Sequence, residues 1–410
     1  MIHRIFDPDK DKEACHRIWR EVAWIENEEH EKAMDIFLEG SRVLLGELNG
    51  NTEALVVSSP GLFRYLDKDI PLSAVCGVTT SYVGRRRGLA GKLTAELVAL
   101  DAAEGAYIAG LGIFDQGYYD KLGFGTGPYE TSVGFDPASL DLNVTPPPPV
   151  RLSKDDWELI HRSRLKRMRV HGNTTLLREE TTRAEMQWSK NGFGLGYMDA
   201  ENELLSHHFW CRPSEGEHGP YAINWMCYRN YFQLLELLGL VKNLGDQVHL
   251  VKLSEPAAIQ MQDLLKTPFR NFRKTEKSRF EATSKAMAYW QIRICNLEKC
   301  LENTLLPGEP VSFNLKLTDP IEKYLEQDAP WRGISGSYIV TLGPQSHAEN
   351  GHDCSLPVLE ASVGAFSRMW IGARPATGLC VTDDLAGPEE LIRKLDSILR
   401  LPTPRVDWDY

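Results

Sequence analysis

Three consecutive arginines stand directly before a glycine in the stretch "VTTSYVGRRRGLAGKL", which runs from Val78 to Leu93. The formal net charge of the chain is -11, so this local concentration of positive charge needs a physical reason. The hydrophobic pattern predicts a strand, a turn at Arg85–Ala90 and then a helix. The first amides of a helix have no partners inside it and, together with the helix dipole, attract anions. The stretch therefore favours a pyrophosphate ligand at the turn.

Small residues in this turn support the same interpretation. Gly88 lets the backbone approach a ligand closely, Ala90 keeps that side uncrowded, and arginine side chains add charge-assisted hydrogen bonds to phosphate. The turn has neither the Gly-Lys-Ser/Thr ending of a Walker loop nor the G-x-G-x-x-G dinucleotide fingerprint. Taken alone, Arg85-x-x-Gly88-x-Ala90 also fits a solvated basic loop at the start of a helix.

The length and composition indicate a multidomain globular protein. The chain has 410 residues, and at roughly 100–200 residues per domain this predicts two to four domains. The sequence is 42% hydrophobic and 25% charged, which is ordinary for a soluble protein with full cores. No run approaches the ~18 apolar residues of a membrane span. The first residues lack the apolar stretch of a signal peptide, so we expect a cytoplasmic protein with no membrane partner.

Cysteine spacing and net charge argue against two classes of ligand, metal ions and nucleic acids. The eight cysteines are scattered without zinc-like spacing, so we expect reduced thiols and no metal. The acidic balance argues against a nucleic-acid partner and fits cationic small molecules better. One basic run, "HRSRLKRMRVHG" at 161–172, is interpreted as a solvated face or as an interdomain or subunit contact.

Four consecutive prolines in "VTPPPPV", at 144–150, mark the sharpest boundary, because such a run fits neither a helix nor a central strand. We expect domains at 1–145, 146–284 and 285–410. The mixture of predicted helices and strands in these segments indicates an α/β or α+β fold class. The strongest periodic patterns predict helices at 8–20, 89–105, 230–245 and 387–399, and strands at 42–48, 52–58, 73–83, 106–113, 193–199, 204–211, 311–317 and 337–343.

The arginine turn followed by an apolar-periodic helix and a further strand resembles the coenzyme A loop of the GNAT acetyltransferase superfamily. The string from Val78 to Leu93, with "GYYDKLGFG" downstream, is similar to one branch, the enhanced intracellular survival (Eis) type of N-acetyltransferase. This resemblance implies a catalytic GNAT domain, a second, degenerate GNAT-like domain and a C-terminal sterol-carrier-like domain. We find no comparable arginine-glycine loop in the second segment, and proteins of this type are typically homohexamers.

The resemblance also implies which residues bind acetyl-CoA. The backbone of Val78 and Thr80 is expected to pair with the pantetheine arm in the manner of a neighbouring strand. The turn is expected to hold the pyrophosphate, and the thioester is expected beside Phe114, where the family often has a small polar residue instead. The turn residues concerned are Arg85, Arg86, Gly88, Leu89 and Ala90.

Acetyl transfer to an amine needs an acid for the departing thiolate and a base for the amine. In "DQGYYDKLGFG", Tyr119 matches the general acid of the family, and tyrosine is neutral at pH 7. Without the resemblance, Tyr119 is better interpreted as a packing tyrosine at a helix start. No internal histidine or glutamate stands out as the base. His207 and His208 are adjacent in a predicted strand, so we expect one to face the core and the other solvent.

In Eis-type enzymes the terminal carboxylate enters the first domain and acts as the base, and here this role falls to Tyr410. Pro402 and Pro404 stiffen the tail, and Val406, Trp408 and Tyr410 alternate as an inserting strand does. The tail also fits a docked segment with only a structural role. A free α-carboxyl has a pKa of about 3.5, so it is ionised at neutral pH but is a weak base. It would therefore act through a water, and a low-dielectric pocket would raise its pKa.

The acceptor is expected to be a primary amine of an aminoglycoside-like polyamine or of lysine. Trp24, Glu26 and Asp409 are the candidate substrate contacts, although charged runs such as the one around Glu26 are often solvated helix faces. The alternative is a non-catalytic protein that binds coenzyme A or lipid through the third domain. That alternative predicts an apolar cavity within residues 285–410, whereas the enzyme predicts a closed core there.

Overall fold

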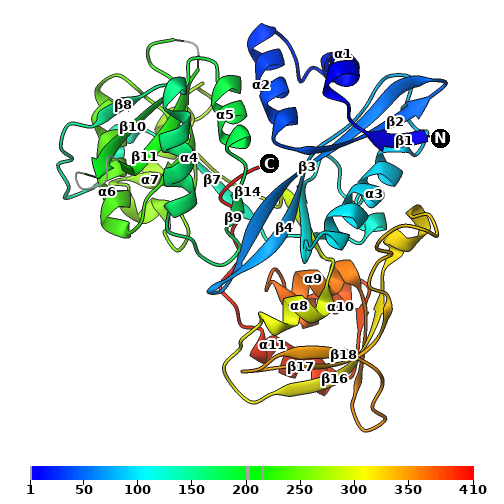
Figure 1. The fold of residues 1–410 in the computed structure, drawn as a ribbon. Coiled ribbons are helices and arrows are strands. Elements are labelled where there is room, and N and C mark those ends of the chain that lie inside the picture. Colours follow the sequence, from blue (N-terminus) through cyan, green and yellow to red (C-terminus); the bar gives the residue numbers. More distant parts are fainter. Residues whose placement is uncertain (1, 200–203, 215) are drawn as a thin grey trace.

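The computed structural model describes residues 2–199, 204–214 and 216–410. The chain forms three parts, each built around one sheet, and Figure 1 shows them in blue and cyan, in green, and in yellow to red. Helices and sheets are mixed throughout, which confirms the expected α/β (α+β) class. None of the helices described is long and apolar enough to cross a membrane.

The first sheet is assembled mainly from the N-terminal segment. Its strand order is β1-β2-β3-β4-β5-β15-β6, and β9 pairs with β3. The predicted Asn-Gly turn lies between β2 and β3, where Asn49 and Gly50 both have positive φ. The strands are β1 (Ile2–Ile5), β2 (Arg42–Leu48), β3 (Asn51–Tyr65), β4 (Lys68–Thr80), β5 (Ile108–Gly112), β6 (Gly125–Thr126), β9 (Thr174–Leu176) and β15 (Trp290–Ile294).

Helices cover both faces of this sheet. On one face α1 (Pro8–Glu21) and α2 (Glu28–Glu39) enclose a core with Trp19 and Val57. On the other face α3 (Leu89–Ala103) packs leucines and alanines against alternate residues of the same strands. Because both faces are buried, the central strands are nearly continuous runs of apolar residues.

The second sheet has the order β14-β7-β13-β12-β11-β10-β8. Its strands are β7 (Glu130–Phe135), β8 (Val150–Leu152), β10 (Phe193–Asp199), β11 (Leu204–Pro213), β12 (Tyr221–Cys227), β13 (Val251–Ser254) and β14 (Thr283–Met287). Around it lie α4 (Trp157–Lys166), α5 (Glu179–Trp188), α6 (Tyr231–Asn243) and α7 (Pro268–Thr275).

The expectation for the paired histidines on β11 is wrong, because both side chains are buried. His208 accepts a hydrogen bond from Trp225 Nε1 at 3.2 Å and lies 3.1 Å from the hydroxyl of Ser163 on α4. His207 points to the opposite face and lies 3.2 Å from Glu236 on α6. Helices on both faces of this sheet therefore leave no solvent side for either histidine.

The third part contains the sheet β18-β17-β16-β19-β20. Its strands are β16 (Val311–Thr318), β17 (Gly336–Leu342), β18 (His347–Asn350), β19 (Val358–Ser362) and β20 (Leu385–Ala386). Its helices are α8 (Leu297–Glu302), α9 (Val363–Trp370), α10 (Ala376–Thr382) and α11 (Glu389–Ile398). Its apolar core continues into the lower end of the first sheet, where the ring of Tyr65 stacks on Trp370 at 4.5 Å.

Strands cross between the sheets, so the three parts are tied together. β7 pairs with β13 and β14 of the second sheet, and β15 pairs with β5 and β6 of the first. On β15, the fully buried Arg293 donates a hydrogen bond of 2.5 Å to Asp319 in the third part. The expected boundaries at 145 and 284 therefore do not coincide with the sheets: β7 precedes the first boundary but belongs to the second sheet, and β15 follows the second boundary but belongs to the first sheet.

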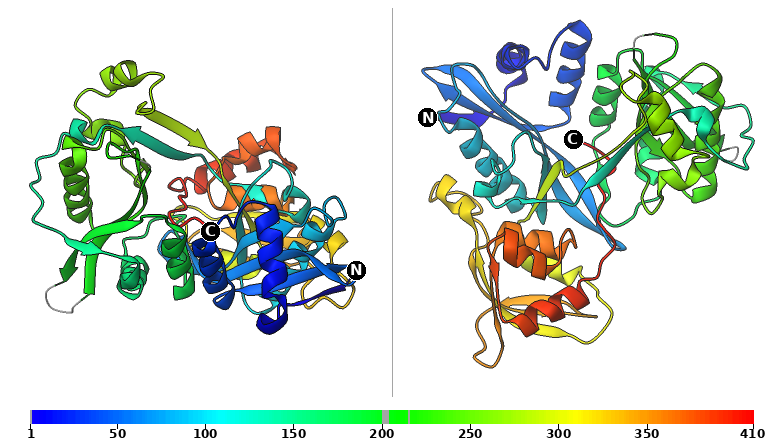
Figure 2. Two further views of the ribbon diagram at one scale, coloured as in Figure 1. Left: turned by 90° about the horizontal axis from the view of Figure 1, so that it is seen from above. Right: turned by 180° about the vertical axis from the view of Figure 1, so that it is seen from behind.

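The C-terminal tail leaves α11 and runs upward between the first and second parts (Figure 2). It ends near the middle of the molecule, as both views of the C-terminus in Figure 2 show. Val406 and Trp408 are buried, but the tail joins no sheet, so the alternation predicted from sequence describes burial and not a strand.

Candidate active site

The first candidate site lies where β4 and β5 separate. The two strands pair in parallel only from Leu72 with Ile108 to Val75 with Leu111, although β4 continues to Thr80. Beyond that point, β4 backbone groups on this side are left without a neighbouring strand. A cavity of about 470 Å³ occupies the opening, and we call it the cofactor cavity. Its lining is Val22, Trp24, Val75, Cys76, Val78, Thr79, Thr80, Arg85, Ala90, Leu111, Gly112, Ile113, Phe114, Tyr118, Tyr119, Tyr289 and Tyr410.

The arginine turn closes one end of this cavity. Gly88 has φ +77° and precedes α3 without a side chain to cap it, so the first amides of the helix remain open to a ligand. Arg85, Arg86 and Arg87 are exposed, and no described residue forms an ion pair with them. Among the three, only Arg85 lines the cavity. Leu89 is buried and anchors the helix start in the core.

If the turn holds the pyrophosphate of acetyl-CoA, as the family resemblance implies, substituting Arg85 with glutamine is expected to raise the KM for acetyl-CoA about 10-fold with little change in kcat. The reason is that a charge-assisted hydrogen bond to phosphate contributes about 1.5–3 kcal/mol before solvent exposure reduces it. Arg87→Gln is the matched control, because Arg87 is also exposed but does not line the cavity. Steady-state kinetics at varied acetyl-CoA provides the measurement. Equal effects of the two substitutions would mean that only the general charge of the turn matters.

The predicted acid, Tyr119, lies on the far wall of the cofactor cavity. It immediately precedes the short 3-10 helix η1 (Asp120–Leu122), and its backbone carbonyl accepts hydrogen bonds from Leu122 N–H and Phe124 N–H. Burial raises the pKa of the Tyr119 hydroxyl, as do the nearby Tyr118 and Tyr289. The hydroxyl makes no hydrogen bond to another described residue. Tyr119 therefore stays protonated at neutral pH, as a proton donor must.

Phe114 is 70% exposed and lies at the mouth of the cofactor cavity. Its ring contacts those of Tyr118 and Tyr119 at centroid distances of 4.9 and 5.8 Å. This position gives Phe114 an apolar contact surface for a ligand but no hydrogen-bonding group.

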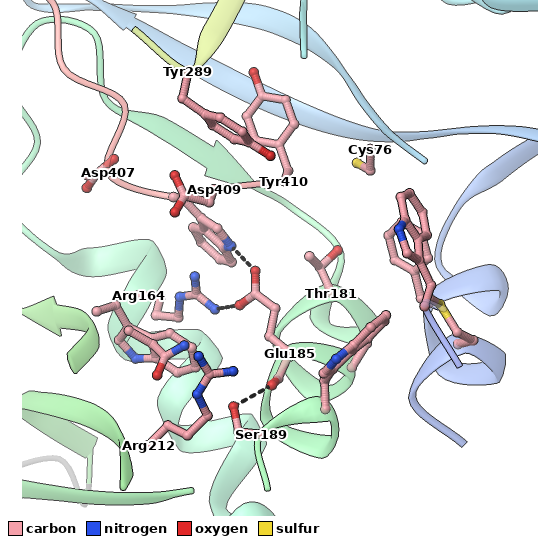
Figure 3. A pocket seen from close by; sticks show the side chains of 18 residues that line it. Cys76, Arg164, Thr181, Glu185, Ser189, Arg212, Tyr289, Asp407, Asp409 and Tyr410 are labelled. Carbon is pink, nitrogen blue, oxygen red and sulfur yellow. Dashed lines mark hydrogen bonds and ion pairs between the residues drawn. The ribbon is translucent and has the colours of Figure 1, made fainter. Parts of the chain in front are cut away.

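A second cavity, of about 440 Å³, lies between the first and second parts, and we call it the acceptor cavity (Figure 3). It meets the cofactor cavity at four shared residues, Trp24, Cys76, Tyr289 and Tyr410. Its other lining residues are Met34, Phe37, Arg164, Thr181, Ala184, Glu185, Trp188, Ser189, Arg212, Asn224, Trp225, Asp407, Trp408 and Asp409. The sequence did not indicate Cys76, Tyr289, Glu185 or Arg164, because the segments that carry them are far apart in the chain.

Cys76 stands at the junction because β4 bulges there. Val57 pairs with Gly77 and Ser58 with Val75, so Cys76 is the extra residue opposite β3. Its thiol lies 3.0 Å from the Ala74 carbonyl, and burial raises its pKa. The bulge thus directs a neutral side chain to the place where the two cavities meet.

The tail is held at the junction by buried contacts to the second part. Arg167 donates two hydrogen bonds to Asp407, at 2.6 and 2.8 Å. The indole N–H of Trp408 donates a hydrogen bond to Glu185 at 2.9 Å. The guanidinium of Arg164 lies 3.5 Å from the centre of the Trp408 ring. The basic run at 161–172 therefore serves, in part, as an interdomain contact, one of the interpretations that its sequence allowed.

These contacts place Tyr410 in both cavities. Its hydroxyl lies so close to Gly110 that a Cβ added there would be 2.3 Å away, so a side chain at this position would have to displace the hydroxyl. Burial raises the pKa of the Tyr410 hydroxyl. Trp24 and Asp409 also line the acceptor cavity. Although part of Asp409 is exposed, desolvation by the surrounding protein and the carboxylates of Glu185 and Asp407 raise its pKa. Glu26, by contrast, is exposed before α2 and lines neither cavity.

Glu130, at the start of β7, is a half-buried acid beside this site that the sequence did not single out. Its Oε1 atom is buried and has no hydrogen-bond partner in the described part of the chain. Burial and the nearby Asp409 raise the pKa of Glu130 to about 8, against an opposing effect of Arg405.

This shift predicts how stability depends on pH. The unfolded state ionises Glu130 above its ordinary pKa of 4.5, whereas the folded state keeps it protonated to about 8. Stability from this group is thus present below pH 4.5 and is lost as the pH rises to 8. Glu130→Gln should raise the unfolding free energy at pH 8 by roughly 2–4 kcal/mol relative to its effect at pH 5. Urea unfolding at both pH values tests this, and an equal effect at both would contradict it.

No family model and no curated protein matches this sequence. Solved structures do match it over the whole chain. A conserved Enterococcus faecalis protein, described as a probable N-acyltransferase, has a TM-score of 0.80 at 17% identity, with 100% of this chain and 99% of that chain covered. A GCN5-related N-acetyltransferase from Anabaena variabilis has a TM-score of 0.77 at 15% identity, with both chains fully covered.

Eis1 from Mycobacterium abscessus matches with a TM-score of 0.76 at 12% identity, again over 100% of both chains. The match extends through all three parts, including the third, and is not limited to the sheet with the separated strands. Over its whole length, the chain therefore has the fold of the GCN5-related N-acetyltransferases.

Proposed function

We propose that this protein is an acetyl-CoA-dependent N-acetyltransferase that acts on a primary amine. The observation that carries the proposal is the meeting of two cavities at Tyr410, one between the separated strands and one between the first two parts. A donor with a pyrophosphate fits the first cavity, since the arginine turn and the open end of α3 lie at its edge. The amine would enter from the second cavity and meet the thioester at the junction.

The proposed roles of the side chains follow from this arrangement. The α-carboxylate of Tyr410, the base that the family resemblance implies, accepts a proton from the ammonium through a water, which frees the lone pair for attack. The C–N bond forms and the C–S bond then breaks. The coenzyme A thiolate takes a proton from the hydroxyl of Tyr119, and the second amine proton restores that hydroxyl. Tyr119 is buried and Tyr410 is half-buried, which limits the access of bulk water and strengthens these interactions.

The backbone of Val78 and Thr80 would bind the pantetheine arm, since this edge of β4 has no neighbouring strand. Arg85, with Arg86 at the exposed side of the turn, would bind the phosphates. A homo-oligomer, such as the hexamer expected from the resemblance, would fix the tail further. We propose no nucleic-acid partner.

The test is release of coenzyme A thiol from acetyl-CoA with a panel of polyamines, aminoglycosides, a lysine peptide and simple aromatic amines. Mass spectrometry should find an acetyl group on the amine. Thiol release that is independent of the amine would indicate hydrolysis only. Binding of acetyl-CoA without turnover for any amine would contradict the proposal.

The alternative of a lipid-binding third part has less support. The interior of residues 285–410 is filled by large buried side chains, among them Phe313, Phe366 and Trp370. A cavity of about 790 Å³ does lie in this part, but its lining includes Glu309, Glu390 and Lys394. Charged groups at such a site disfavour an apolar ligand, so the acetyltransferase remains the function that we propose.

A further inference from the structure

The charges in the acceptor cavity are largely cancelled by neighbours, and this bears on the acceptor. Glu185 forms an ion pair with Arg164, and Asp407 forms one with Arg167. Of the acidic side chains that line the cavity, Asp409 alone has no ion pair with a described residue. One free side-chain carboxylate is a weak match for an acceptor that carries several positive charges.

The cavity also contains a cation with no internal partner. Arg212, near the end of β11, lines the cavity and is exposed. Its side chain forms neither a hydrogen bond nor an ion pair with any residue that the structure describes. An arginine in that state offers a planar set of donors, which suits a carboxylate or a phosphate.

A polar side chain lies on the neighbouring strand and lines the same cavity. Cys211 pairs with Ile223 and Trp210 with Trp225, so Asn224 is the extra residue of a bulge in β12. It lines the acceptor cavity, and its amide likewise has no hydrogen bond within the described ranges. Arg212 and Asn224 thus bring two unused donor groups from adjacent strands to the lining of one cavity.

The lining of the cavity also contains several large aromatic side chains. Trp24, Phe37, Trp188, Trp225 and Trp408 all line the cavity. In Figure 3, Tyr410 lies at the top of the pocket and Arg212 at the bottom, with Thr181 and Glu185 between them. A ligand that reaches both ends needs a flat or apolar middle, because flat aromatic walls favour such surfaces.

We propose that the acceptor carries its primary amine and an anionic group at opposite ends of an aromatic or other apolar body, and that Arg212 and Asn224 bind the anionic end. This inference rests on the proposed function for the identity of the amine end. It makes Arg212 a specificity-determining residue and not a catalytic one. It also replaces the expected polycation by an acceptor with one positive and one negative end.

The test compares 4-(aminomethyl)benzoate with 4-methylbenzylamine, two amines that differ by a carboxylate in place of a methyl group. Isothermal titration in the presence of coenzyme A should give a Kd about 10-fold lower for the benzoate, since a charge-assisted pair contributes on the order of this factor. In Arg212→Gln the ratio should fall to about 1. Arg162→Gln, on the exposed side of α4, is the matched control and should keep the native ratio.

Turnover of the same two amines separates this inference from the proposed function. If neither amine is acetylated but the binding ratio depends on Arg212, the anion site stands and the proposed chemistry fails. If both are acetylated but the native ratio of Kd values is 1 or below, the anion site is wrong. A high ratio that persists in Arg212→Gln would overturn the role of Arg212 as well.

Discussion

Extending the chain by two glycines after Tyr410 should lower kcat by about 10²–10⁴-fold, the range that a positioned base contributes. The extension converts the terminal carboxylate into a peptide group, so the proposed base disappears from the junction of the cavities. The expected loss falls on kcat, because the cofactor cavity and its arginine turn are untouched. Steady-state kinetics with acetyl-CoA and any active amine gives the measurement.

Two controls make this result interpretable. Tyr410→Phe keeps the carboxylate and the ring and removes only the hydroxyl near Gly110, so it should retain most of the activity. Thermal unfolding should show that the extended chain keeps its fold, since Trp408 and the ion pair between Arg167 and Asp407 still anchor the tail. Full activity in the extended chain would remove Tyr410 as the base and favour a tail with only a structural role.

Replacing Tyr119 with phenylalanine should lower kcat by about 10²–10³-fold, with a smaller change in the KM for acetyl-CoA. The substitution removes the hydroxyl that protonates the leaving thiolate and keeps the ring packing. It should not reduce stability much, because the hydroxyl has no hydrogen-bond partner in the described structure. Unchanged thermal unfolding with reduced kcat is therefore the expected pair of results.

Tyr118→Phe is the matched control, because its ring lies 4.9 Å from that of Tyr119 and lines the same cavity. It should change kcat little. The native enzyme should show no loss of activity from tyrosine ionisation between pH 7 and 10, since burial raises the pKa of Tyr119 above the ordinary value of 10. A similar loss in both variants would argue that Tyr119 acts through packing.

Local patterns in the sequence determined the arginine turn, the helix that follows it and the hairpin at the Asn-Gly turn. Each depends on neighbours within a few residues: Gly88 adopts positive φ before the helix, and the leucines of α3 recur at helical spacing. The family resemblance extended this local information to Tyr119 and Tyr410, which line one cavity in the structure.

Only the tertiary structure determined what surrounds these residues. The sequence pattern left open whether the basic run at 161–172 faces solvent. In the structure Arg164 and Arg167 are buried, where they form ion pairs with Glu185 and Asp407. His207 is buried because α6 covers its face of the sheet, a fact that alternation within β11 does not encode. Arg212 and Tyr410 line the same cavity, although about half of the chain lies between them in the sequence. Burial and ion pairing depend on contacts between distant segments, and local patterns do not specify those contacts.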